Sequence, residues 1–223
     1  MTQKIIIISG GRLGEPAFYQ KRLAALKNFS VICCDGGIRH SETLQIKPDI
    51  IIGDMDSATA DQLASYQSQG VKILKYPQDK DDTDTQLAIN YALELKPEVI
   101  EIWGALGGRL DHTLANLSLL SCGAKAGIDT RLVDEYCEAF VVYGEANFTE
   151  AKGQAVSLFA YPVRADGITL RGFQYSLDKE SLDVDNSRCI SNVITASPAT
   201  ISFDAGSLLV IRYWQKNIFP EAV

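Results

Sequence analysis

Two aspartates separated by a single residue stand where an apolar run ends, in the stretch "IIGDMDSATADQL" at residues 51–63. Two like charges this close repel each other unless a cation or a set of hydrogen-bond donors lies between them. The D-x-D pair has little weight alone, because Asp is common in turns and at helix N-caps. Asp54 and Asp56 therefore raise a hypothesis of cation binding that needs a second observation.

The second observation is the acidic stretch "QDKDDTD" at residues 78–84, in which only Lys80 offsets the carboxylates. Its acids are Asp79, Asp81, Asp82 and Asp84. A T-x-x-Q capping box at Thr83 and Gln86, together with a helix dipole, explains one or two of them. Mg²⁺ explains the excess, because it takes oxygen ligands, commonly one or two carboxylates with water and substrate phosphates. We therefore predict a divalent-cation site.

Glycines provide a complementary signal for anion binding. In "GALGGRLDH" at residues 104–112, Gly107 and Gly108 precede a predicted helix whose free N–H groups attract an anion. Arg109 adds a planar fork that suits phosphate oxygens. The alternative is a tight strand-to-helix connection with a surface arginine. Gly36 and Gly37 in "DGG" either admit a nucleotide to the backbone or form a turn and nothing more.

The elements that must position these residues follow from the apolar pattern of the first 134 residues. Unbroken Ile and Val runs predict strands buried on both faces at residues 4–9, 31–34, 49–53, 71–76, 99–104 and 129–133. Helical patterns lie between them at residues 58–69, with Ser57 as the expected N-cap and Gly70 closing the helix, and at residues 84–95 and 110–126. This alternation predicts an α/β fold with an open parallel sheet and flanking helices.

After Tyr136 the pattern changes to short β-rich pieces broken by Gly, Pro and Asp. Such spacing predicts a C-terminal antiparallel β-sandwich, with a domain boundary near Asp134. In the parallel sheet, each chemically suggestive loop follows a strand. Loops at the carboxyl ends of parallel strands share one edge, so we expect these loops to converge.

Composition excludes several other functions. The chain has 223 residues and a net charge of −7, which argues against a nucleic-acid partner. Five cysteines without a C-x-x-C pair, and two histidines, form neither a disulfide framework nor a zinc site. The apolar run after Lys4 is too short for a signal peptide, and no stretch is long enough to span a membrane, so we expect a cytoplasmic protein. P-loop, dinucleotide and nucleophile-elbow motifs are absent from the sequence.

The segments "DGG", "GDMDS", "KDDTDTQLAI", "GALGGRLDHTLANL" and "SRCISNVI" together resemble the thiamine pyrophosphokinase family, in order and in spacing. Ile38, where a small residue is usual, and Met55, often aromatic or leucine, depart from the family pattern without removing a polar group. The resemblance implies Mg²⁺-dependent transfer of a pyrophosphoryl group from ATP to the thiamine hydroxyl. It also implies an ATP- and Mg²⁺-binding catalytic domain at residues 1–134, a thiamine-binding sandwich at residues 135–223, and a homodimer that shares the thiamine site.

The same resemblance assigns roles to individual residues. The metal ligands it implies are Asp54, Asp56 and Asp84, with Asp81 as a further ligand or water-holder. The ATP-binding residues it implies are Gly36, Gly37, Thr83, Gly107, Gly108 and Arg109. The thiamine-binding residues it implies are Asp111, Ser191 and Asn192. Asp111 either attracts the thiazolium cation or accepts the hydroxyl proton, while Ser191 and Asn192 have an ordinary polar turn as their alternative.

Two other functions remain open from the residues alone. A nucleotide-sugar glycosyltransferase also uses D-x-D but does not explain the glycine–arginine–aspartate loop. A non-catalytic nucleotide or metal sensor predicts ATP binding without turnover. A purely structural protein would have no use for so many carboxylates at one edge.

Overall fold

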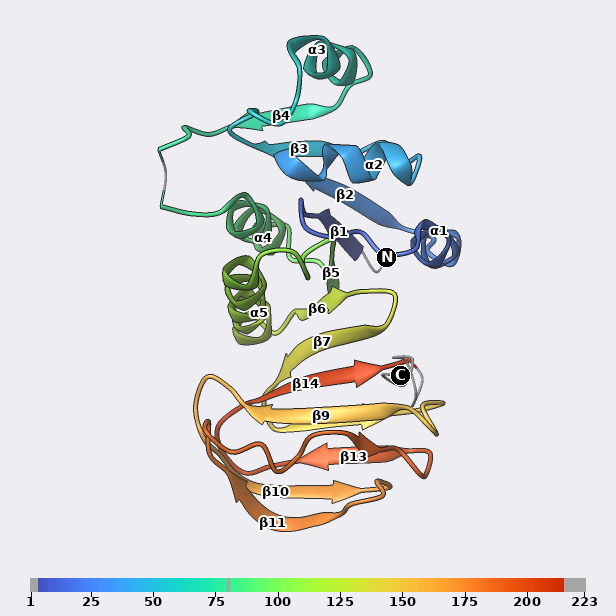
Figure 1. The fold of residues 1–223 in the computed structure, drawn as a ribbon, viewed down its shortest axis with the longest axis vertical. Coiled ribbons are helices and arrows are strands. Elements are labelled where there is room, and N and C mark those ends of the chain that lie inside the picture. The colour runs from blue at the N-terminus through green and yellow to red at the C-terminus, as the bar shows by residue number, and fades with distance from the viewer. Residues whose placement is uncertain (1–3, 80, 215–223) are drawn as a thin grey trace, which may run out of the picture. The chain divides into compact units, whose positions relative to one another are not determined.

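The computed structural model describes residues 4–79 and 81–214 (Figure 1). The chain forms two compact units, residues 1–135 and 136–223. The predicted fold class is confirmed, because the first unit carries a parallel sheet with helices and the second carries antiparallel sheets.

The first unit is built on parallel strands in the order β6-β5-β1-β2-β3-β4. The strands are β1 (Lys4–Ile8), β2 (Phe29–Cys34), β3 (Ile50–Gly53), β4 (Lys72–Lys75), β5 (Val99–Trp103) and β6 (Asp129–Val133). The isoleucines at residues 5–8 of β1 and at residues 51 and 52 of β3 are almost fully buried, as the unbroken apolar runs predict. The chain runs outward from β1 to β4 and then returns to β5 on the other side of β1. Such a change of direction is where open α/β sheets bind ligands.

Helices connect these strands. They are α1 (Pro16–Ala24), α2 (Ile38–Thr43), α3 (Ala60–Ser68), α4 (Asp84–Glu94) and α5 (Leu110–Lys125), with a 3-10 turn at Asp35–Gly37. The helices α4 and α5 pack side by side (Figure 1). On β5, Glu101 bonds to Arg22 of α1, whereas the neighbouring Ile100 pairs with Thr130, which faces α5. Successive strand residues point to opposite faces, so α1 and α5 cover opposite faces of the sheet.

The predicted helix starts were partly wrong. The N-cap of α3 is Thr59 rather than Ser57, and it forms a capping box with Gln62. Ser57 lies three residues before the start of α3 at Ala60, and its hydroxyl donates to Asp56 Oδ1 at 3.1 Å instead of capping the helix. At α4, Thr83 Oγ1 accepts the Gln86 N–H at 3.2 Å, but the Gln86 side chain donates to Asn90 instead of completing the box.

Gly123 allows α5 to pack closely on β6. A Cβ at this position would overlap the side chain of Thr130. We expect Gly123→Ala to lower the free energy of unfolding by about 1–3 kcal/mol through overpacking. Urea denaturation measures this, with Ser118→Ala on the exposed face of the same helix as control, expected within about 0.5 kcal/mol of the wild type. Equal stability of the two variants would contradict this account of the packing.

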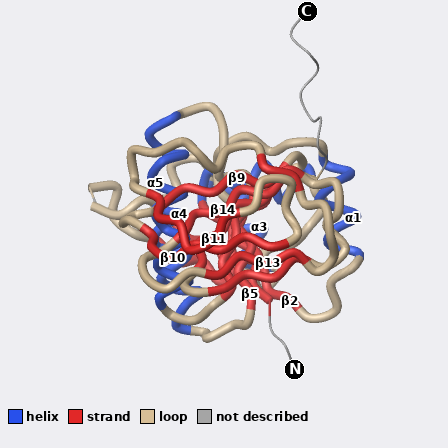
Figure 2. Tube along the Cα trace, turned by 90° about the horizontal axis from the view of Figure 1, so that it is seen from below, coloured by secondary structure: helices blue, strands red, loops and turns tan. Residues whose placement is uncertain are grey.

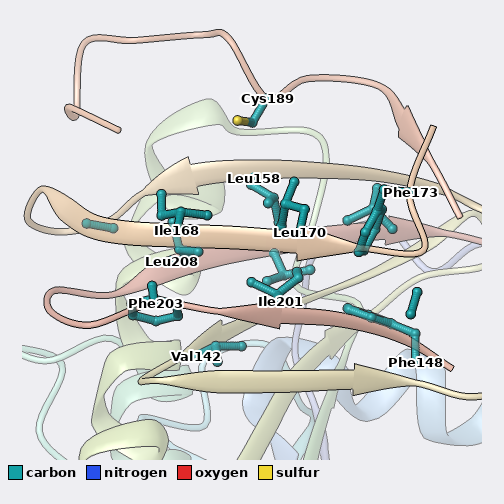
Figure 3. Packing of buried hydrophobic residues seen from close by; sticks show 14 of the residues in the cluster. Val142, Phe148, Leu158, Ile168, Leu170, Phe173, Cys189, Ile201, Phe203 and Leu208 are labelled. Carbon is teal, nitrogen blue, oxygen red and sulfur yellow. The ribbon is translucent and has the colours of Figure 1, made fainter. Parts of the chain in front are cut away.

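The second unit contains strands and no helix among its described residues (Figure 2). Its strands form two antiparallel layers, in the orders β12-β9-β14-β7 and β11-β10-β13-β8. The strands are β7 (Cys137–Val142), β8 (Glu145–Phe148), β9 (Ala155–Ala160), β10 (Ala165–Arg171), β11 (Leu177–Leu182), β12 (Asn192–Val193), β13 (Ala199–Ser202) and β14 (Leu208–Tyr213). Figure 3 shows their inward side chains, among them Leu158, Leu170 and Ile201, gathered into one core. This arrangement is the predicted sandwich.

Within residues 4–79 and 81–214, no helix combines the length and apolar character needed to cross a bilayer.

Candidate active site

A cavity of about 630 Å³ opens at the carboxyl ends of the parallel strands. Every loop that leaves one of the strands β1 to β5 contributes to its lining. Examples, in strand order, are Gly10, Gly36, Ser57, Asp84 and Gly108. The structure thus brings together the loops that the sequence predicts to converge. The volume of the cavity lies in the range of small-molecule sites.

Acidic side chains gather at this edge of the sheet. Carboxylate oxygens of Asp35, Asp54 and Asp56 lie within 4.8 Å of one another. Asp84 joins them across the end of β3, where a Cβ built on Gly53 would lie 2.6 Å from Asp35 Cβ and 2.9 Å from Asp84 Oδ2. Only a glycine at residue 53 leaves room for both acids. Asp81 is exposed in the loop before α4 and is not among the acids gathered here.

Local backbone geometry aims the D-x-D pair. Met55 is buried and has a φ of 65°, a left-handed conformation that is uncommon for a non-glycine residue. The Asp56 N–H lies 3.4 Å from Asp54 Oδ1, and Ser57 Oγ donates to Asp56 Oδ1 at 3.1 Å. The turn at Met55 therefore sends a side chain into the core and leaves both carboxylates at the edge, an arrangement typical of strained functional sites.

Asp35 is the acid that sequence reasoning missed. It is 1% exposed, and its Oδ2 accepts the Ser57 N–H at 2.9 Å. Its Oδ1 has no hydrogen-bond partner among the described residues. Burial raises the pKa of this carboxyl, and the charges of Asp56, Asp54 and Asp84 raise it further. A buried oxygen without a donor, surrounded by like charges, fits a divalent cation that takes oxygen ligands.

This environment makes a prediction for Asp35→Asn. An amide beside three acids relieves repulsion, so the variant should be about 1–2 kcal/mol more stable than the wild type in a chelator. Adding Mg²⁺ should stabilise the wild type and do so much less for the variant, because the ion binds the native wild type more tightly. Urea denaturation with and without Mg²⁺ measures both effects. Equal stabilisation of the two proteins by Mg²⁺ would argue against Asp35 as a ligand.

The glycine loop after β5 forms the opposite wall. Gly107 and Gly108 have φ values of 76° and 77°, a region open to glycine at little cost, and both line the cavity. No side chain caps the N-terminus of α5. Helices of this kind leave backbone N–H groups available for an anion.

Arg109 and Asp111 are paired with each other at the start of α5. Arg109 Nε donates to Asp111 Oδ1 at 3.1 Å, and Nη2 donates to Oδ2 at 2.5 Å. These hydrogen bonds lower the pKa of Asp111 to about 2. In this arrangement Asp111 is a weak proton acceptor, and the charge of Arg109 is already compensated by a carboxylate.

The remaining predicted ATP-binding residues lie in different environments. Gly36 lines the cavity, but Gly37 lies outside its lining and packs against β1, where a Cβ would overlap the carbonyl of Ile8. Thr83 lines the cavity while its hydroxyl caps α4. Sequence reasoning also missed Ser9, whose hydroxyl lies 2.7 Å from Thr85 Oγ1 on the cavity wall.

The predicted thiamine-binding pair Ser191 and Asn192 lies in the second unit. Ser191 is exposed, and its backbone N–H donates to Ser157 Oγ at 3.0 Å. Asn192 is buried, and its amide bonds to both backbone groups of Tyr175, at 3.0 and 2.7 Å. Asn192 therefore holds the chain at Tyr175, a residue that is 64% exposed.

Two family models match the chain. The model described as "Thiamin pyrophosphokinase, catalytic domain" matches residues 23–132. The model described as "Thiamin pyrophosphokinase, vitamin B1 binding domain" matches residues 145–208.

Individual relatives agree with these matches. The thiamine pyrophosphokinase of Bacillus subtilis is 34% identical over 170 residues, which cover 75% of this chain and 79% of the relative. A crystal structure of the Bacillus subtilis enzyme has a TM-score of 0.83 at 29% identity, with 94% of this chain and 98% of that chain covered. A crystal structure of thiamin pyrophosphokinase from Geobacillus thermodenitrificans has a TM-score of 0.79 at 27% identity, with 96% and 97% covered.

Proposed function

The chain belongs to the thiamine pyrophosphokinase family, and from this premise we propose that it is a thiamine diphosphokinase. It transfers the pyrophosphoryl group of ATP to the hydroxyl of thiamine. The hydroxyl oxygen forms a bond to the β-phosphorus, and the bond from that phosphorus to the oxygen of the α-phosphate breaks. The products are thiamine diphosphate, AMP and the proton of the hydroxyl group.

The observation that carries the proposal is the joint lining of one cavity by an acidic cluster and a glycine loop. A nucleotide triphosphate needs both, because its own charge must be neutralised and its phosphates must be held close to backbone N–H groups. Transfer of this kind depends mainly on positioning and charge neutralisation by the protein, with little covalent chemistry.

Mg²⁺ is part of the proposal. Asp54, Asp56 and Asp84 would hold it, and the buried Asp35 joins them as a fourth candidate. When bound, the ion neutralises charge on the phosphate oxygens. Asp81 is exposed and lies outside the cluster, so in this proposal it binds a water molecule of the ion rather than the ion itself.

The chain's own groups orient the substrates. Gly107, Gly108 and the first turn of α5 hold phosphates, and Gly36 lets the nucleotide approach the backbone. Asp111 has a pKa of about 2 and therefore does not accept the hydroxyl proton; it attracts the thiazolium cation when that cation takes the place of Arg109. Gly37 does not line the cavity; it packs against β1 and so supports the turn after β2 that carries Gly36.

The second unit, residues 136–223, supplies the thiamine-binding surface in this proposal. Ser191 is the exposed polar contact there, and Asn192 acts through the loop that it holds. The active form is a homodimer that shares the thiamine site, and the protein acts in the cytoplasm. Light scattering that gives a mass twice the 24.4 kDa of the chain supports the dimer, and a mass of one chain contradicts it.

Incubation with ATP, Mg²⁺ and thiamine tests the proposed activity. We expect AMP and thiamine diphosphate in equal amounts, and no AMP when thiamine is left out. Formation of ADP, or AMP formation independent of thiamine, would contradict the proposal. ATP binding without any turnover would instead favour a sensor, and transfer from a nucleotide sugar would favour a glycosyltransferase.

A further inference from the structure

Three arginines line the cavity, and carboxylates neutralise two of them. Arg12 donates through Nη2 to Asp134 Oδ2 and through Nη1 to Glu135 Oε1, both at 2.9 Å. Arg109 forms its two-point pair with Asp111. Each of these two guanidinium groups already has a carboxylate beside it, so a further anion gains less from its charge.

Arg39 is different from both. Its Nη2 donates to the carbonyl oxygens of Gly10 at 2.5 Å and Gly11 at 3.4 Å. These are its only hydrogen bonds among the residues that the structure describes, and none of the carboxylates there forms an ion pair with it. Its side chain is exposed and lines the cavity, so its positive charge is available to a ligand.

The backbone around Arg39 fixes where this charge lies. The loop after β1 packs directly on the loop after β2, since a Cβ on Gly10 would lie 3.0 Å from the Gly36 backbone. Both Arg39 and the neighbouring His40 contact the loop after β1. His40 Nε2 lies 2.8 Å from the Gly11 carbonyl oxygen, to which Arg39 also donates. One edge of the guanidinium is thus tied to the backbone. A side chain that is held in place loses less entropy when it binds a ligand.

We propose that Arg39 binds the phosphate chain of the nucleotide and is the main cationic determinant of its affinity. This inference rests on the proposed function, and it ranks Arg39 above Arg109, whose exposed pair with Asp111 must open before Arg109 can bind a phosphate. A complex of a metal ion with a polyphosphate offers its cation to the acidic cluster and its free oxygens to an arginine. The acidic cluster and Arg39 lie at this one cavity. Arginine suits the oxygens because its planar fork donates several parallel N–H groups. If Arg39 only held the loop after β1, through the Gly10 and Gly11 carbonyls, a neutral N–H donor would be enough.

Arg39→Gln and Arg39→Lys test this proposal, with Arg171→Gln in the second unit as a matched control. Gln keeps an N–H donor for the Gly10 carbonyl but loses the charge, whereas Lys keeps the charge. Calorimetry at one fixed Mg²⁺ concentration measures the Kd for inorganic pyrophosphate and for ATP. We expect Arg39→Gln to weaken both by about tenfold or more, Arg39→Lys to lose less, and the control to bind like the wild type. Binding by Arg39→Gln should also depend less steeply on salt.

Steady-state kinetics give an independent measure, since the KM for ATP should rise while the KM for thiamine stays the same. The inference is overturned if Arg39→Gln binds pyrophosphate as tightly as the wild type. It is also overturned if Arg39→Lys weakens binding as much as Arg39→Gln, because the charge of Arg39 would then not matter. Failure of the wild type to bind pyrophosphate would overturn it too. The two proposals fail separately. ATP binding without transfer to thiamine defeats the proposed function alone, and transfer to thiamine with full affinity in Arg39→Gln defeats this inference alone.

Discussion

Asp54→Asn should lower turnover by about 10²–10³-fold while the protein remains folded. The amide keeps the shape of the carboxylate but removes one negative charge from the cluster with Asp35 and Asp56. Metal ions contribute several kcal/mol to stabilising charge in phosphoryl transfer, and each 1.36 kcal/mol corresponds to a tenfold change in rate. The rate of AMP release in the presence of thiamine measures the effect, and the urea midpoint reports the fold.

Asp61→Asn is the matched control. Asp61 is exposed in the first turn of α3 and does not line the cavity, so its loss should leave turnover within about twofold of the wild type. If Asp54→Asn changes the affinity for ATP but not turnover, the acidic cluster serves binding alone and the catalytic role of its metal ion is contradicted.

Glu101→Ala should destabilise the first unit by about 3 kcal/mol, the largest stability effect that we expect. Glu101 is 4% exposed on β5 and accepts hydrogen bonds from Arg22 Nε at 2.6 Å and Nη2 at 2.9 Å. Trp103 Nε1 donates to it as well, at 3.1 Å. Removing the carboxylate leaves the partly buried guanidinium of Arg22 and the buried indole N–H of Trp103 without this acceptor. The free-energy cost of leaving these donors unpaired exceeds the net stabilisation that the intact ion pair provides.

Urea unfolding followed by tryptophan fluorescence measures this loss, because Trp103 lies beside Glu101. Asp178→Ala is the control, since it breaks an exposed pair with Arg171 at 3.1 Å and should cost less than about 1 kcal/mol. Equal losses in the two variants would mean that burial of the Glu101 pair contributes nothing.

Sequence patterns predict the parallel sheet well because its strands are buried on both faces. Runs such as "KIIII" have few alternatives, and the sequential order of strands limits the topology. The same reasoning misses β11 (Leu177–Leu182), whose sequence "LDKESL" is mostly exposed and pairs with β10 through register shifts. It also misses α1, which buries only Tyr19, and α2, which has six residues and buries mostly polar ones, so neither shows an apolar helical stripe.

The convergence of the loops was predictable for a similar reason, since it follows from the rule for carboxyl ends of parallel strands. The role of each residue in the cavity was less so. In "DGG", Asp35 has the sequence signature of a turn, and its burial arises only when β3 and α4 bring Gly53 and Asp84 against it. No local pattern signals such long-range packing.

Charge pairing was equally hidden in the sequence. Arg109 has the position expected of a phosphate ligand, yet Asp111 occupies its guanidinium. Arg39 follows the glycines without any motif of its own, and only the folded structure shows that it has no carboxylate partner within residues 4–79 and 81–214. Which cations are available to a ligand is a property of the folded structure.

A crystal structure with a non-hydrolysable ATP analogue, Mg²⁺ and thiamine tests the central claim most directly. The account predicts an ion about 2.1 Å from oxygens of at least two of the four clustered acids, with the phosphates against the glycine loop. These acids are Asp35, Asp54, Asp56 and Asp84. An ion bound elsewhere, or a triphosphate outside this cavity, would contradict it.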